Sequence, residues 1–178
     1  LSAENNGCPP LLIYGKKMTG GKVTINGSIS SQYFSALLMS LPYSENDTEI
    51  IVEGDLVSKP YIDMTIDIMN DFGVKVINND YKSFFIKSNQ RYSARNYNIE
   101  IDASNSSYFA GIAAVTKSRV ILNNVKQDSK QGDFYFFEIL KNMGCEVKYS
   151  DNKVEIIGGD LKGIEIDMKH YSDVVQTL

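Results

Sequence analysis

The chain has 178 residues, 43% of them hydrophobic, and its formal net charge at pH 7 is −4. A chain of this size and composition can bury a substantial core, and its acidic balance argues against nucleic acid as a general partner. It has neither a basic leader nor an apolar run near the ~18 residues of a membrane-spanning helix, so we expect a soluble cytoplasmic protein with no membrane contact.

The few residues that commonly bind metals do not form a metal site in this sequence. Cys8 and Cys145 lack metal-ligand spacing and have no evident reason to pair, which is typical of a reducing compartment. His170 is the only histidine, which excludes a zinc site built from several histidines. We expect His170 to be a packing or hydrogen-bonding residue rather than a catalyst, and we predict no bound metal.

A first structural unit is predicted from about residue 22 to residue 89. Gly73 follows its second helix in the way that a left-handed C-cap glycine does, and Asn79-Asp80 predicts a hairpin turn. The expected elements, in order, are a strand at 22–26, a helix at 31–41, a strand at 48–54, a helix at 60–72 and strands at 74–78 and 83–87.

The turn between the first strand and the first helix is rich in small polar residues, reading Gly-Ser-Ile-Ser-Ser-Gln over 27–32. The first turn of a helix has unpaired backbone N–H groups and the positive end of the helix dipole, so it can hold an anion. Ser30 and Ser31 add hydroxyl donors for a phosphate, and Gln32 adds an amide that can reach a second group. The alternative is an ordinary turn with a serine N-cap.

The same order of elements recurs in a second unit, from about 97 to 163. Ile-Glu-Ile-Asp at 99–102 returns at 164–167, where a third unit begins that stops at Leu178, in what should be a helix. Such internal repetition indicates stacked copies of one supersecondary unit. The expected elements of the second unit are a strand at 98–102, a helix at 106–116, a strand at 119–124, a helix at 131–143 and strands at 145–149 and 153–157, with Gly144 as a C-cap and Asp151-Asn152 as a hairpin turn.

The distribution of apolar residues predicts that the helices lie inside. Residues 110–115 are apolar all round, so we expect that helix to be buried on every side, and residues 35–39 are nearly as apolar. The strands alternate, with Phe84 and Ile86 against Lys87, which is typical of a sheet with one wet face. The sequence therefore predicts an α/β fold of repeated strand-helix-strand-helix-strand-strand units, with buried helices and mixed sheets outside.

Several motifs together resemble the 5-enolpyruvylshikimate-3-phosphate synthase family. They are residues 27–32, Gly-Asp-Leu-Val-Ser-Lys-Pro-Tyr-Ile at 54–62, Asn-Gly-Cys-Pro-Pro-Leu at 6–11, Gln-Gly-Asp at 131–133 and Met-Lys-His-Tyr-Ser-Asp at 168–173. The resemblance runs the length of the chain. It implies an inside-out α/β barrel of six repeats in two domains, of which residues 1–98 would belong to one and residues 99–178 to the other.

The resemblance also implies an activity. Enzymes of this family transfer the enolpyruvyl group of phosphoenolpyruvate to the 5-hydroxyl of shikimate 3-phosphate, without a cofactor, in the pathway to chorismate and the aromatic amino acids. It implies shikimate 3-phosphate contacts at Ser30, Ser31, Gln32, Ser58 and Tyr61. Gln32 would also lie near phosphoenolpyruvate, and Asp173 would accept the proton of the 5-hydroxyl. From the residues alone, Asp173 reads as an N-cap.

The chain departs from this family in extent. The opening segment of the family, with its lysine and arginine, is absent, and so is a later part that supplies more basic residues. We therefore expect a central, inactive fragment of a longer, monomeric enzyme.

Two alternatives remain open. One is a UDP-sugar enolpyruvyl transferase, whose family uses a catalytic cysteine in a loop, where neither Cys8 nor Cys145 lies. The other is a non-catalytic repeat domain that binds an anionic ligand.

Overall fold

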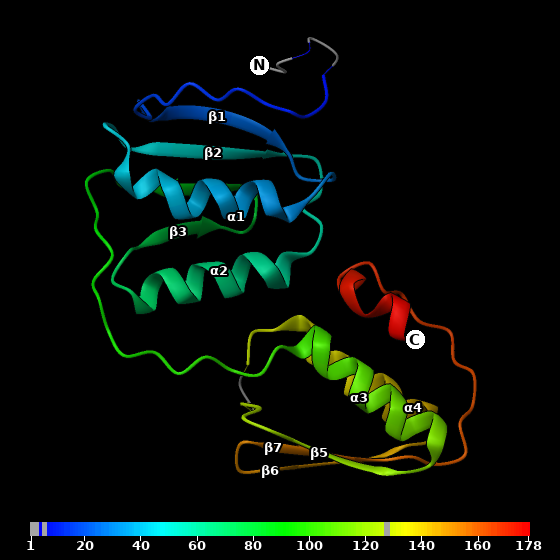
Figure 1. The fold of residues 1–178 in the computed structure, drawn as a ribbon. Helices are drawn as coiled ribbons and strands as arrows, with labels where there is room; N and C mark the ends of the chain where they lie inside the picture. Colours follow the sequence, from blue (N-terminus) through cyan, green and yellow to red (C-terminus); the bar gives the residue numbers. More distant parts are fainter. Residues whose placement is uncertain (1–3, 5–6, 127–128) are drawn as a thin grey trace.

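The computed structural model describes residues 4, 7–126 and 129–178, so Asn6 of the 6–11 motif lies outside the described residues. Two sheets, each covered on one face by its own helices, follow one another along the chain (Figure 1). The predicted mixed α/β architecture of repeated units is confirmed. Within the described part of the chain, no helix is both long and apolar enough to cross a membrane.

The first unit has the elements that the sequence predicts, shifted by a few residues at their ends. They are β1 (Gly21–Asn26), α1 (Ser31–Ser40), the short 3-10 helix η1 (Leu41–Tyr43), β2 (Thr48–Glu53), α2 (Lys59–Asp71), β3 (Val76–Asn79) and β4 (Ser83–Ile86). The sheet order is β1-β2-β4-β3, and only the β1–β2 pair is parallel. Because parallel strands end at the same edge of a sheet, the turns into α1 and α2 lie side by side.

The predicted turns and helix ends of both units are confirmed. Gly73, which follows the C-cap residue of α2, and Gly144, the C-cap of α4, have positive φ angles of 88° and 117°, a conformation that favours glycine. The hairpins after β3 and β6 contain Asp80 and Asn152, which also take positive φ. In each unit, alternate strand residues face the core, and Phe84, Ile86, Val154 and Ile156 are fully buried.

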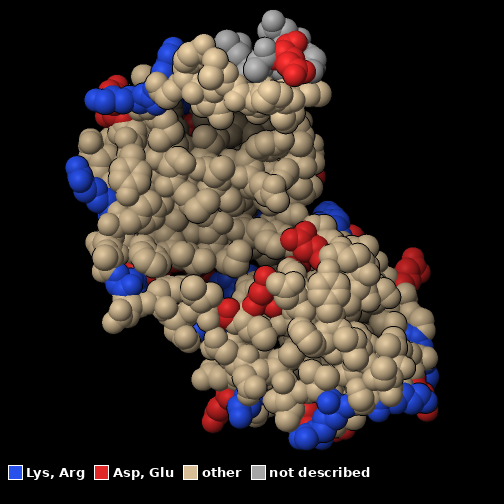
Figure 2. Space-filling view, viewed as in Figure 1, with Lys and Arg blue, Asp and Glu red and all other residues tan. Residues whose placement is uncertain are grey.

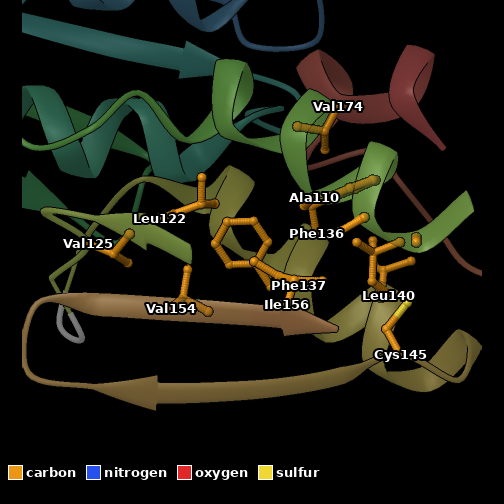
Figure 3. Packing of buried hydrophobic residues seen from close by; sticks show 13 residues of the cluster. Ala110, Leu122, Val125, Phe136, Phe137, Leu140, Cys145, Val154, Ile156 and Val174 are labelled. Atoms are coloured by element: carbon orange, nitrogen blue, oxygen red, sulfur yellow. The ribbon is translucent and has the colours of Figure 1, made fainter. Parts of the chain in front are cut away.

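The second unit forms a three-stranded antiparallel sheet of order β5-β7-β6. Its elements are α3 (Ala103–Thr116), β5 (Arg119–Asn123), the 3-10 helix η2 (Gly132–Phe134), α4 (Tyr135–Met143), β6 (Glu146–Ser150) and β7 (Lys153–Ile157). Figure 3 shows Phe136, Phe137 and Leu140 of α4 packed among apolar residues of α3 and the sheet.

The strand predicted at 98–102 does not form. Side chains take the backbone groups that a neighbouring strand would use: Asn124 donates to the carbonyl of Ile99 at 2.8 Å, and Gln131 donates to the carbonyl of Ile101 at 2.9 Å. One backbone bond, from Ile101 to Asn124 at 3.2 Å, runs toward the residue after β5. The segment therefore lies along the second unit without entering its sheet.

The third unit also differs from the prediction. The expected strand at 164–167 has no partner strand among the described residues, and a 3-10 helix, η3 (Ser172–Thr177), stands where a helix was expected. Val174 of η3 is buried in the core of the second unit, close to Ala110 (Figure 3). The hydroxyls of Ser107 and Thr177 are 2.8 Å apart. These contacts fix the end of the chain against α3.

Helix α3 is not buried on every side, contrary to the prediction. Ala110 and Ala113 are fully buried, but Phe109, Ile112 and Val115 are 56%, 52% and 73% exposed. A helix that is apolar all round needs packing partners on both sides, and the described residues cover one side only. The buried residues form two separate clusters, one in each unit.

Candidate functional site

The starts of α1 and α2 are held together by Gly27. Its carbonyl accepts a hydrogen bond from the N–H of Val57 at 3.1 Å, and a Cβ at Gly27 would lie 2.7 Å from Cγ1 of Val52. A side chain at this position would separate the two turns. One turn further along, the hydroxyls of Ser35 and Thr65 lie 3.0 Å apart across the two helices.

The start of α1 has the features that the sequence predicts. Ser30 is its N-cap, and the hydroxyl of Ser30 accepts a hydrogen bond from the N–H of Gln32 at 3.2 Å. A hydroxyl that accepts one bond keeps its hydrogen for another partner, so capping and ligand binding are compatible at Ser30. Ser31 is buried and Gln32 is exposed.

The start of α2 has an unusual backbone at Ser58. This residue adopts the left-handed conformation, with φ 55° and ψ 41°, and its side chain makes no capping hydrogen bond. A non-glycine residue in this region stores strain, which is more frequent at functional sites. The ammonium of Lys59 lies 4.9 Å from the ring centre of Tyr81.

Tyr61, in the first turn of α2, reaches the second unit. Its hydroxyl donates to Oδ1 of Asp133 at 2.8 Å, and the hydroxyl of Ser104 donates to Oδ2 of the same carboxylate at 2.5 Å. Burial raises the pKa of Tyr61 well above its usual value, and the hydrogen bond and charge of Asp133 raise it further. Tyr61 stays a neutral phenol at physiological pH.

Asp173 lies close to Tyr61. The charge of Asp173 raises the pKa of the Tyr61 hydroxyl, and the nearby backbone of Asp173 lowers that pKa. The side chain is exposed and sits in the first turn of η3, whose N-cap is Tyr171. Because no side chain makes a capping bond there, the N-cap role considered for Asp173 is not observed. Nδ1 of neighbouring His170 is buried without a hydrogen-bond partner among the described residues.

The structure thus places Ser30 and Ser58 at two adjacent helix starts, and it places Asp173 near enough to Tyr61 for its charge to affect the pKa of that phenol. Sequence reasoning missed Asp133 and Ser104, although Asp133 belongs to the Gln-Gly-Asp motif at 131–133. The signal was present, but no pattern in the sequence shows that this motif meets α2.

The electrostatics of this junction depend on backbone and hydroxyl dipoles. No lysine or arginine in the described residues forms an ion pair with Asp133 or Asp173. On the face shown in Figure 2, acidic side chains lie along the edge of the second unit, the lower one in this view, near the junction with the first unit. Helix starts and hydroxyls can orient an anionic ligand beside a carboxylate, but strong anion binding needs further cations.

Comparison with known proteins gives a consistent result. A profile of the family described as EPSP synthase (3-phosphoshikimate 1-carboxyvinyltransferase) matches residues 1–178. The chain is 45% identical over 176 residues to the 3-phosphoshikimate 1-carboxyvinyltransferase of Erwinia tasmaniensis, covering 98% of this chain and 41% of the relative. It is 48% identical over 175 residues to that of Trichormus variabilis, with the same two coverages.

Among solved structures, the EPSP synthase from Acinetobacter baumannii shares the fold, with a TM-score of 0.66 at 20% sequence identity, over 99% of this chain and 40% of that chain. The chain therefore spans about 40% of the length of the relatives it matches. From its motifs, its repeated units and the match along its whole length, the chain belongs to the EPSP synthase (3-phosphoshikimate 1-carboxyvinyltransferase) family.

Proposed function

We propose that this chain forms part of an enzyme that transfers the enolpyruvyl group of phosphoenolpyruvate to the 5-hydroxyl of shikimate 3-phosphate, releasing phosphate. The observation that carries the proposal is the junction where Tyr61 of α2 binds Asp133 of the second unit, beside the adjacent starts of α1 and α2 and with the charge of Asp173 acting on Tyr61. Membership of the family supports it, and it sets aside the UDP-sugar transferase alternative.

Each site residue has a role in this proposal. Ser30, Ser31 and Gln32 bind shikimate 3-phosphate at the start of α1, with Gln32 also near phosphoenolpyruvate, and Ser58 and Tyr61 add contacts from α2. Asp173 accepts the proton of the 5-hydroxyl. An ionised carboxylate within hydrogen-bond reach of an alcohol can serve as a general base, and the exposed side chain of Asp173 is open to a ligand.

The organisation proposed for the whole enzyme follows the same family. Residues 1–98 belong to one domain and residues 99–178 to the other, a division that the two separate hydrophobic clusters support. The enzyme acts as a monomer in the cytoplasm, without nucleic acid or membrane as a partner, in keeping with its net charge of −4.

A non-catalytic anion-binding role is the second candidate. One observation favours it for the isolated chain: no lysine or arginine of the described residues pairs with the carboxylates at the junction. Two strongly anionic substrates require more positive charge than helix starts supply.

A hybrid enzyme tests the proposed binding site. It consists of the Erwinia tasmaniensis relative with its matched segment replaced by this chain. Replacing Ser30 and Ser31 by alanine in the hybrid should weaken shikimate 3-phosphate binding by about 1–3 kcal/mol, the contribution of hydrogen bonds to a charged group, as measured by calorimetry.

The matched control is Ser40→Ala, at the opposite end of α1, where the hydroxyl donates to the carbonyl of Ala36 at 2.7 Å. This variant should bind the ligand normally. Loss of the Ser30 cap alone costs about 0.5–2 kcal/mol of stability, so thermal unfolding is recorded in parallel. Unchanged affinity in the double alanine variant would show that these serines do not hold the phosphate.

A further inference from the structure

Asp133 is a buried carboxylate at the meeting point of the two units. Its residue is 3% exposed, and its two oxygens accept hydroxyls from Tyr61 of α2 and Ser104 of α3. No lysine or arginine of the described residues pairs with it. Burying a carboxylate is costly unless hydrogen bonds satisfy its oxygens. Here two hydroxyl donors from different parts of the chain satisfy them.

The two residues before Asp133 attach the same motif to both units. Oε1 of Gln131 accepts the N–H of Ala103 at 2.9 Å, which fixes the beginning of α3. Gly132 lies against α2, and a Cβ there would be 2.8 Å from Cβ of Pro60. Residues 131–133 therefore contact the starts of α2 and α3 together.

We propose that Asp133 is a positioning residue of the candidate site: by accepting the hydroxyls of Tyr61 and Ser104, it holds the start of α2 against the start of α3, beside Asp173. This role rests on the proposed function, in which Tyr61 contacts shikimate 3-phosphate. Asp133 itself does not touch the ligand. It acts by fixing where the Tyr61 hydroxyl lies and where the first N–H groups of α2 point.

The polarity of the Tyr61 hydroxyl also follows from this contact. A phenol has one hydrogen to donate, and Tyr61 gives it to Asp133. Its lone pairs remain to accept hydrogen bonds from other groups. An asparagine amide at position 133 could donate to the Tyr61 oxygen instead. The phenolic hydrogen would then be free to donate to another group.

The structure contains a matched control for this contact. The hydroxyl of Tyr81 donates to both carboxylate oxygens of Asp63, at 2.8 and 2.7 Å. This is the same chemistry as the Tyr61–Asp133 pair, but both residues belong to the first unit. Asp63→Asn therefore removes a tyrosine–carboxylate pair without affecting the contact between the units.

The experiment compares Asp133→Asn with Asp63→Asn in the 178-residue chain by NMR. Tyrosines are labelled with ¹³C at Cζ, and the Tyr61 and Tyr81 signals are assigned with Tyr61→Phe and Tyr81→Phe. The Cζ signal reports the hydrogen bonding and ionisation of each phenol. The affinity for shikimate 3-phosphate is measured from shifts of the amide signals of Ser31 and Gln32, a method suited to weak binding.

Asp133→Asn should move the Tyr61 signal, lower the pH at which Tyr61 ionises, and weaken the ligand about 5- to 20-fold, as expected for loss of one charge-assisted contact. Asp63→Asn should change the Tyr81 signal and leave the ligand affinity as it is. In Tyr61→Phe, adding Asp133→Asn should cause little further loss of affinity, because the carboxylate acts through the phenol.

Ligand affinity that Asp133→Asn leaves unchanged, or that Asp63→Asn reduces equally, would overturn the inference. If Asp133→Asn does not fold, Tyr61→Phe and Ser104→Ala each remove one of the two hydrogen bonds, and the inference is overturned if neither weakens the ligand. If the amide signals of the wild-type chain do not respond to the ligand, measurable binding requires the rest of the enzyme. The Tyr61 signal then decides the inference, which fails if Asp133→Asn leaves that signal in place.

Discussion

At the scale of residues, two carboxylates near Tyr61 have different environments and therefore different uses. Asp173 is exposed and makes no capping bond, so a ligand can reach it. Asp133 is buried and its oxygens are occupied by hydroxyls. The exposed carboxylate suits proton transfer, and the buried one suits the fixing of its neighbours.

Replacing Asp173 by asparagine tests proton acceptance. Asparagine preserves the size of the side chain but cannot take a proton from an alcohol, so the hybrid enzyme should lose about 10²–10⁴ in kcat while KM changes little. Steady-state kinetics measure both constants. Ser172→Ala is the control, because it removes the neighbouring hydroxyl that donates to Asp173 at 3.1 Å and keeps the carboxylate. A variant with normal turnover would exclude Asp173 as the base.

Tyrosines paired with carboxylates should make the chain sensitive to alkaline pH. Burial, followed by the neighbouring carboxylate, raises the pKa of Tyr81 from 10.0 to about 12, and similar causes raise the pKa of Tyr149 to about 12. A pKa raised by folding gives stability that is complete below the unfolded value and is lost as pH rises through the folded value.

The free energy of unfolding, measured in urea, should therefore fall as the pH rises from 10 toward 12. Tyr81→Phe should reduce the size of this fall, since its ring cannot ionise. An equal fall in the variant and the wild type would show that Tyr81 does not contribute.

At the scale of elements, the sequence correctly predicted those features that depend only on residues close together in the chain. The start of α1 at Ser31 and the hairpin turns at Asp80 and Asn152 depend on neighbouring residues, and these predictions are confirmed. The strand predicted at 98–102 failed because the side chains of Asn124 and Gln131, distant in sequence, take its carbonyls. Pairing decisions of this kind depend on tertiary contacts, which override β-propensity.

The exposed apolar side of α3 gives a test at this scale. We expect Ile112→Asp to change the stability of the isolated chain by less than about 1 kcal/mol, as at other surface positions. In the hybrid enzyme, where the relative supplies the remaining length, the same change should cost more than about 2 kcal/mol, because it would bury a charge. Urea unfolding measures both values.

Ala113→Asp, on the fully buried side of α3, is the control and should destabilise both proteins. Equal, small effects of Ile112→Asp in the two proteins would mean that this side of α3 faces solvent in the longer enzyme as well.

At the scale of the whole molecule, the site depends on contacts that no single segment encodes. The parallel β1–β2 pair brings the turns into α1 and α2 together, and both turns lie between the strands and helices that the sequence predicts. The meeting of Tyr61 with Asp133 joins residues 72 positions apart. Spacing in the sequence carries no information on such a contact, so the junction emerged only from the structure.

The most direct test of the account is phosphate release from phosphoenolpyruvate, measured in a coupled assay with the hybrid enzyme and with the isolated 178-residue chain. The hybrid should release phosphate only when shikimate 3-phosphate is also present, if this chain supplies the serines, Tyr61 and Asp173 of the proposed site. The isolated chain should release none, since the charged transition state needs cations from the rest of the enzyme. A folded hybrid that releases no phosphate, or an isolated chain that turns over, would contradict the account.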